Sequence, residues 1–208
     1  MTAIGRLHPA QPARKVIEQA AAAIRRGGVV AIPTDTVYGL AADPFQPEAV
    51  RRLLRLKQRP GHKPILLLVD SLRQIETLAA RMPAAVERIA AQYWPGPLTV
   101  VLPAAPCVPE TITAGTGTVA VRIPGSTVTR EIIRAARVPL TGTSANLSGR
   151  PAAESAAQVR EQFPKGLALI VDAGPAFGRA LSTILDLTGE PRVLREGAVP
   201  AADLLCRC

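Results

Sequence analysis

Aromatic, histidine and lysine residues are scarce in this chain of 208 residues. Aromatic side chains make up 3% of it, which argues against a protein that stacks the bases of single-stranded nucleic acid on aromatic rings. His8 and His62 are the only histidines, so a histidine-based metal cluster is excluded. No apolar run approaches the roughly 20 residues that span a bilayer, so we expect no membrane association.

Several widespread catalytic motifs are also absent. The chain has neither the G-x-x-x-x-G-K-[ST] phosphate loop nor a G-x-G-x-x-G dinucleotide loop after a strand. It has no H-E-x-x-H zinc motif and no G-x-S-x-G nucleophile elbow. These absences argue against acyl-enzyme and zinc chemistry. We therefore expect no covalent nucleophile and no metal held by protein side chains.

Cysteine is sparse too, occurring at Cys107, Cys206 and Cys208. An odd number, with two of the three one residue apart, is a poor disulfide framework and fits a reducing compartment. Residues 1–12 lack the basic-then-apolar pattern of a secretory signal, so we expect a cytoplasmic location. The terminal Cys-x-Cys could bind a metal, but we interpret it as part of a frayed tail.

The formal net charge is +9, and nearly all of the positive charge is arginine. Lysine occurs only at Lys15, Lys57, Lys63 and Lys165. Such a charge attracts polyanions such as nucleotides or RNA. A mutational bias toward arginine on solvated faces would give the same composition, and charge alone does not separate the two interpretations.

Hydrophobic periodicity predicts alternating helices and strands. Apolar residues at helical spacing predict helices over 13–26, 48–57, 72–80, 83–92, 128–136 and 155–163. Short apolar runs predict strands over 29–32, 64–70, 98–102, 119–123, 138–140, 167–171, 182–187 and 192–194. This alternation predicts a single α/β domain whose sheet is covered by helices.

The segment 141–149, TGTSANLSG, combines hydroxyls, an amide and two glycines directly after a short apolar run. We expect a loop whose backbone N–H groups and hydroxyls face an anion. Upstream, Lys57 and Arg59 supply the cations that such an anion would attract. Together the two segments predict a site for a phosphate or a carboxylate.

Arg122 is the most conspicuous single residue, because it interrupts the apolar strand predicted over 119–123. A buried arginine needs an anionic partner. That partner is either an anionic ligand or a structural carboxylate such as Asp35 or Asp186, and the residues alone leave both open. Polar clusters at 33–40 and at Ser182 also lie at strand ends, where ligands collect in open α/β sheets.

Six segments, in this order, resemble the successive signatures of the YrdC-like threonylcarbamoyl-AMP synthases: PTDTVYGL (33–40), LKQRP (56–60), WPGPLT (94–99), VAVR (119–122), SANLSG (144–149) and STI (182–184). The resemblance covers residues 13–197, which leaves 198–208 as a C-terminal tail. It implies an α/β fold with a twisted mixed sheet and a large basic cavity. The extra C-terminal domain of the longer branch of this family is not expected here.

The resemblance also implies a reaction. L-Threonine, bicarbonate and ATP, the last accompanied by Mg²⁺, give threonylcarbamoyl-AMP and pyrophosphate. That product supplies the threonylcarbamoyl group of N6-threonylcarbamoyladenosine in tRNA, and a separate threonylcarbamoyl transferase complex performs the final step. A direct contact with tRNA or double-stranded RNA is also possible.

Individual residues inherit expected roles from the resemblance. The expected threonine-binding positions are Thr36, Leu68, Arg122, Gly142 and Ser182. The expected ATP-binding positions are Lys57, Arg59, Lys63, Thr118, Ser144, Asn146, Ala152 and Arg195, with Lys57 and Arg59 neutralising charge during catalysis. Three positions depart from several relatives: Lys63 replaces Asn, Leu68 replaces a threonine-contacting His, and Ala152 replaces a small polar residue.

Two other classes of protein remain as alternatives. A double-stranded RNA-binding or ribosome-assembly factor could use the same basic cavity for a duplex backbone. A related domain forms a carbamoyl adenylate from carbamoyl phosphate, but it normally accompanies zinc-finger and transferase modules, and neither occurs in this sequence.

Overall fold

The computed structural model describes residues 2–6, 13–58, 63–176 and 180–206. Its helices are α1 (Ala13–Arg25), α2 (Pro47–Lys57), α3 (Leu72–Leu78), α4 (Ala84–Tyr93), α5 (Glu110–Thr113), α6 (Thr127–Ala136), α7 (Ala156–Gln162) and α8 (Ala201–Leu205). Its strands are β1 (Ile4–Arg6), β2 (Val30–Ile32), β3 (Gly39–Ala41), β4 (Leu67–Leu68), β5 (Leu98–Pro103), β6 (Thr118–Arg122), β7 (Leu140–Thr141), β8 (Thr143–Ser144), β9 (Leu169–Asp172), β10 (Thr183–Asp186) and β11 (Arg192–Arg195).

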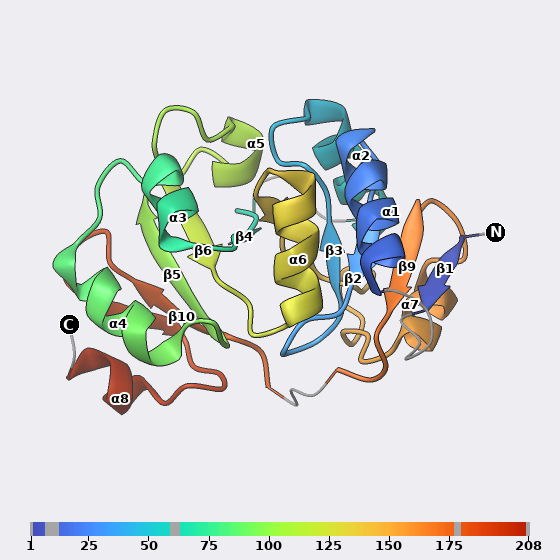
Figure 1. Ribbon diagram of the computed structural model, residues 1–208. Coiled ribbons are helices and arrows are strands. Elements are labelled where there is room, and N and C mark those ends of the chain that lie inside the picture. Colours follow the sequence, from blue (N-terminus) through green and yellow to red (C-terminus); the bar gives the residue numbers. More distant parts are fainter. Residues whose placement is uncertain (1, 7–12, 59–62, 177–179, 207–208) are drawn as a thin grey trace.

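The strands form two mixed sheets, and helices alternate with them along the chain (Figure 1). One sheet has the order β1-β9-β2-β3-β8, and the other has the order β11-β10-β5-β6-β4-β7. The predicted α/β class is confirmed. The sequence predicted one covered sheet, but the strands divide between two, because pairing between strands distant in the chain leaves no local pattern.

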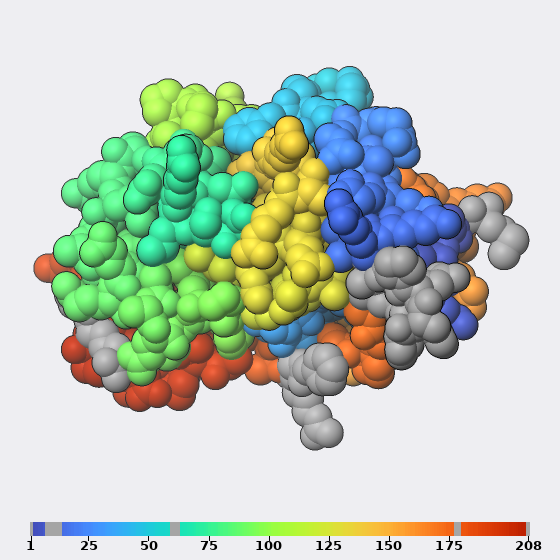
Figure 2. Space-filling view, in the orientation of Figure 1, coloured from blue at the N-terminus to red at the C-terminus, as the bar shows by residue number. Residues whose placement is uncertain are grey.

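Helices α1 and α6 pack against each other and cover the first sheet. The apolar side chains that predicted α1, among them Val16, Ala20 and Ile24, are buried with Ile132 and Ile133 of α6. Burying each such aliphatic side chain contributes about 1.5–3 kcal/mol. In the space-filling view α6 lies between α1 and α3, so the helices on the two sheets form one continuous surface (Figure 2).

Helices α3 and α4 cover one face of the second sheet. Val100 and Val121, which pair across β5 and β6, join Ile75 of α3 and Ile89 of α4 in the same apolar core. Because side chains alternate along a strand, the neighbouring residues of β5 and β6 point to the opposite face. That opposite face, away from α3 and α4, is the one available to a ligand.

Several elements differ from the sequence-based expectation, and β1, β3 and α5 were not predicted. The strand predicted over 64–70 is reduced to β4, and the one over 138–140 to β7, which pairs with β4 in the second sheet. The next strand, β8, pairs with β3 in the first sheet. The predicted tail after residue 197 holds α8, in which Leu204 is fully buried. No helix among the described residues has the length and apolar character needed to cross a membrane.

Candidate active site

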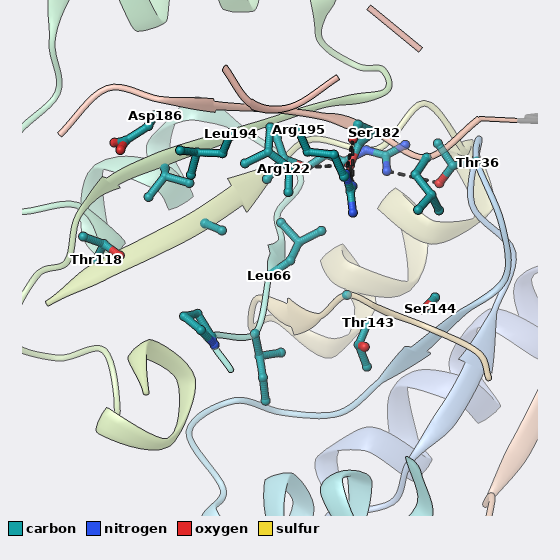
Figure 3. Close-up of a pocket in the computed structure, with 18 of the residues that line it drawn as sticks. Thr36, Leu66, Thr118, Arg122, Thr143, Ser144, Ser182, Asp186, Leu194 and Arg195 are labelled. Atoms are coloured by element: carbon teal, nitrogen blue, oxygen red, sulfur yellow. Dashed lines mark hydrogen bonds between the residues drawn. The ribbon is translucent and has the colours of Figure 1, made fainter. Parts of the chain in front are cut away.

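A cavity of about 590 Å³ lies on the uncovered face of the second sheet (Figure 3). Alternate residues of three neighbouring strands form its floor: Thr99 and Val101 of β5, Thr118, Ala120 and Arg122 of β6, and Ile184 and Asp186 of β10. The strand register aligns these residues in rows, since Val101 pairs with both Ala120 and Asp186. Thr36 lies beside Arg122 at one end, and Leu66 and the segment from Gly142 to Ser144 also line the cavity.

Arg122 is 3% exposed and its guanidinium is held on three sides. Its Nε donates to the carbonyl of Gly96 (2.9 Å) and its Nη1 to the hydroxyl of Thr36 (3.2 Å). Its Nη2 lies 2.6 Å from Oδ1 of Asp35, an ion pair whose geometry is outside that of a hydrogen bond. Of the two structural carboxylates considered for Arg122, Asp35 is therefore its partner. Asp186 pairs instead with Arg192.

Arg195 reaches the same part of the cavity from β11. A β-bulge between Ile184 and Leu185 shifts the register, so that Arg195 pairs with Ile184 and shares its face of the sheet. Its Nη2 donates to the carbonyl of Ser182 (2.7 Å) and to the Ser182 hydroxyl (3.2 Å). Burial, and then the positive charge of Arg122, lower the pKa of the Arg195 guanidinium, which still remains protonated at neutral pH.

Ser182 and Thr36 each sit beside one of these arginines. The Ser182 hydroxyl is hydrogen-bonded to that of Thr99 (2.9 Å), and the Thr36 hydroxyl is hydrogen-bonded to that of Thr34 (3.0 Å). Both residues are buried and both line the cavity. The structure thus brings together three residues predicted for threonine, Thr36, Arg122 and Ser182, along with Arg195, which was predicted for the nucleotide (Figure 3).

Gly142 and Leu68 lie one behind the other. Gly142 lines the cavity, whereas Leu68 is buried in the apolar core and does not belong to the cavity wall. A Cβ added to Gly142 would lie 2.6 Å from Cγ of Leu68. Leu68 therefore lies behind Gly142, and its expected role toward threonine stays a prediction.

Lys57, the last residue of α2, is 2% exposed and lies beneath the loop that follows β8. Its Nζ donates to the carbonyls of Ser144 and Asn146 (2.9 Å to Asn146) and to Oδ1 of Asn146 (3.2 Å). These contacts engage the Lys57 ammonium within the protein. Lys57 thus holds the loop, and the cavity wall, which includes Ser144, includes neither Lys57 nor Asn146.

The backbone of this loop is turned inward, which corrects the expectation that its N–H groups face an anion. The N–H groups of Ala145, Leu147 and Ser148 donate to Tyr38, Gln162 and Lys57 respectively. The Asn146 side chain is also used internally, since its Nδ2 donates to the carbonyls of Leu147 (3.1 Å) and Arg150 (2.6 Å). The backbone amides of Ala145, Leu147 and Ser148 are thus paired within the protein, and the Ser144 hydroxyl donates to Oδ1 of Asn146 (2.6 Å).

The remaining predicted ATP positions lie in different surroundings. Thr118 lines the cavity, and its hydroxyl is hydrogen-bonded to that of Thr116 (2.9 Å). Lys63 is exposed and precedes Pro64, which lines the cavity, while Ala152 is partly buried outside the wall. Arg59 lies outside the described residues. The roles assigned to all of these positions stay predictions.

Sequence reasoning missed part of the cavity. It considered Asp186 only as a partner for Arg122, and it omitted Thr99, Arg192 and Leu194, which all line the wall. Every second side chain of a strand points to the same face, so Ile184 and Asp186 share the face of Ser182. This spacing could have identified Asp186 as a cavity residue. Arg192 can be identified as a cavity residue only when its pairing with Asp186 across β10 and β11 is known.

The comparisons with known proteins agree on one family. The Sua5/YciO/YrdC family, described as "Telomere recombination", matches residues 22–197. The threonylcarbamoyl-AMP synthase of Pyrococcus abyssi is 41% identical over 189 residues, which cover 90% of this chain and 56% of that protein. A putative threonylcarbamoyl-AMP synthase of Mycobacterium tuberculosis is 41% identical over 192 residues, which cover 92% of this chain and 88% of that protein.

A solved structure is similar in both fold and sequence. The structure of P. abyssi Sua5 complexed with L-threonine matches this chain with a TM-score of 0.92 and 38% identity. The match covers 100% of this chain and 60% of that one. The chain thus spans a little over half the length of the Pyrococcus proteins and most of the length of the mycobacterial one.

Proposed function

The chain belongs to the Sua5/YciO/YrdC family, and on that premise we propose that it is an L-threonylcarbamoyladenylate synthase. The reaction joins L-threonine, bicarbonate and ATP into threonylcarbamoyl-AMP and releases pyrophosphate, which makes the protein a nucleotidyltransferase. Relatives named as this synthase support the proposal, including one of which the chain covers 88%. The double-stranded RNA-binding alternative is not favoured, because the relatives reported above carry the synthase name.

The observation that carries the proposal is the charge of the cluster around Ser182. The guanidinium groups of Arg122 and Arg195 lie close enough for their charges to interact, and Asp35 is the carboxylate paired with Arg122. Two positive charges and one negative charge leave a single unit of positive charge beside buried hydroxyls. That charge attracts anions, and it suits the carboxylate of an amino acid beside Arg122 and a phosphate of the nucleotide beside Arg195.

The hydroxyls around this cluster suit the rest of a threonine molecule. Thr36 and Ser182 offer hydroxyls within the same part of the cavity, and Gly142 leaves room on the facing wall. We assign these three residues, with Arg122, to threonine. We assign Ser144, Thr118, Ala152 and Arg195 to the nucleotide, together with Lys63 and Arg59 near its phosphates. Lys57 and Asn146 hold the loop that carries Ser144.

The chemistry needs no covalent intermediate with the protein. The neutral threonine amine forms a C–N bond to the carbon of bicarbonate with loss of water, or to carbon dioxide with loss of a proton, and either route gives a carbamate. A carbamate oxygen then attacks the α-phosphorus of ATP, and the bond to pyrophosphate breaks. Two anions must approach each other, so the protein contributes by neutralising charge and by positioning the reactants.

Mg²⁺ enters the proposal only as a companion of the ATP phosphates. Among the described residues no cluster of three or more His, Cys, Asp or Glu side chains could hold a metal ion. No step is assigned to the ion. The cytoplasmic location, the transferase complex acting on tRNA and a direct contact with RNA stay predictions.

A turnover assay tests the proposal. Pyrophosphate release is measured with ATP and bicarbonate in the presence of threonine, serine or carbamoyl phosphate. We expect release that requires threonine, is slower with serine, and does not occur with carbamoyl phosphate. Release that is independent of the amino acid, or that requires carbamoyl phosphate, would contradict the assignment.

A further inference from the structure

The two ends of the cavity differ in character. Figure 3 shows Asp186 and Thr118 toward one end and Arg122, Ser182 and Thr36 toward the other. The Asp186 end has an apolar floor, made by Val101 and Ala120, which lie in the same row of the sheet as Asp186. Leu194, which is 52% exposed, adds a large apolar side chain to the same wall. A ligand group that binds here must therefore offer apolar surface.

Arg192 stands at this end as a planar cation in a fixed orientation. It pairs with Asp186 across β10 and β11, so both side chains lie on the cavity face. Its Nε lies 3.0 Å and its Nη2 lies 2.9 Å from Oδ2 of Asp186. The Arg192 side chain is 72% exposed, yet this contact fixes it, whereas a free surface arginine samples many rotamers.

Both carboxylate oxygens of Asp186 already accept hydrogen bonds from the protein, so Asp186 influences a ligand by positioning Arg192. Its Oδ1 accepts from the backbone N–H of Thr188 (2.9 Å) and from the Thr188 hydroxyl (2.7 Å). With Oδ2 engaged by Arg192, the carboxylate has no obvious capacity left for a ligand. The groups that can meet a ligand are the planar face of Arg192 and its remaining N–H groups. Apolar surface beside a planar cation is the surrounding that a nucleobase prefers.

We propose that Arg192, positioned by Asp186, holds the base of the bound nucleotide, with Leu194 and the apolar floor contacting the base. This inference rests on the proposed function and deepens it. Asp186 and Ile184, the partner of Arg195, are two residues apart on β10, which corresponds to about 7 Å. That spacing is comparable to the ribose that separates a base from its α-phosphate. The phosphates would then lie toward Arg195, next to the site assigned to threonine.

Direct binding measurements test this inference without turnover. The equilibrium affinities for ATP and for inorganic triphosphate are compared in the wild type, Arg192→Ala and Arg192→Lys. Losing the planar contact should weaken ATP binding about 10-fold in both variants, while triphosphate affinity stays within about 2-fold. Arg192→Lys keeps a cation beside the buried Asp186, so it provides a folded variant if Arg192→Ala is unstable.

Arg134→Ala is the matched control. Arg134 is also a largely exposed arginine paired with a carboxylate, Asp70 (3.2 Å), but it lies outside the cavity wall. Its removal should leave both affinities unchanged. Equal losses for ATP and triphosphate in Arg192→Lys, or unchanged ATP affinity, would overturn the role of Arg192. A wild type that binds no ATP would overturn the proposed function as well.

Discussion

Arg122 and Asp35 form an ion pair at the base of the cavity, with Nη2 of Arg122 lying 2.6 Å from Oδ1 of Asp35. Arg122 therefore has a structural partner, and the same guanidinium lines the cavity. The two interpretations of a buried arginine that the sequence left open are compatible. Asp35 compensates the charge of one guanidinium, and the nearby Arg195 leaves the cluster with a net single positive charge.

Arg122→Ala should abolish threonine-dependent turnover and leave ATP affinity within about 2-fold, because the lost cation is the one assigned to the carboxylate. It should also lower the free energy of unfolding by about 3–5 kcal/mol, since Asp35 is left buried without its partner. Denaturant unfolding and threonine titration measure the two effects. Adding Asp35→Asn should restore part of the stability and none of the turnover. Normal threonine affinity in Arg122→Ala would refute the assignment.

Lys57→Ala should destabilise the protein and lower its turnover, and the size of both losses should be the same at low and high salt. Each buried acceptor left without its donor costs about 1–3 kcal/mol. Lys63→Ala is the control, because Lys63 is exposed. Its removal should leave stability unchanged and reduce ATP affinity only at low salt, where the Debye length exceeds about 10 Å. If Lys57→Ala had wild-type stability and its loss of turnover disappeared at high salt, Lys57 would instead bind the phosphates directly.

Gly142→Ala should destabilise the protein by about 1–3 kcal/mol, because the new methyl group would overlap the buried Leu68 side chain. The same substitution should cost less in a Leu68→Ala background, which opens the space behind it. Unfolding free energies of the four proteins in this double-mutant cycle measure the coupling. Costs that simply add would mean that the two side chains do not compete for this space.

Asp186 should make stability depend on pH in acid. Burial alone would raise the pKa of its carboxyl, but hydrogen bonds from Thr188 and Arg192 outweigh burial and lower the pKa. The folded protein therefore binds this proton less readily than the unfolded chain, whose Asp pKa is about 3.9. The resulting stabilisation is complete above that value and is lost as the pH falls through the folded pKa. The difference in unfolding free energy between wild type and Asp186→Asn should shrink in that range, and a constant difference would contradict the prediction.

Local patterns predicted much of the fold and part of the site. The helical spacing of Val16, Ala20 and Ile24 identified α1, and the lone arginine in an apolar strand identified Arg122. Pairing between distant segments was not predictable in this way. The bulge that turns Arg195 toward Ser182 occurs in a four-residue strand, which is too short for its periodicity to reveal an inserted residue.

Lys57 shows a second limit. In the sequence it stands two residues from Arg59, and both were interpreted as cations for one anion. In the structure Lys57 ends α2 on its buried side, where its partners are Ser144 and Asn146. The sequence linked the correct segments, but it could not show that the link is an internal contact.

Identification of the product tests the central claim most directly. The protein is incubated with ATP, threonine and isotope-labelled bicarbonate, and the nucleotide products are analysed by mass spectrometry. We predict threonylcarbamoyl-AMP carrying the label in its carbamoyl carbon, and no such product when threonine is omitted. Only AMP or unchanged ATP under conditions in which the protein is folded, or an unlabelled carbamoyl product, would contradict the account.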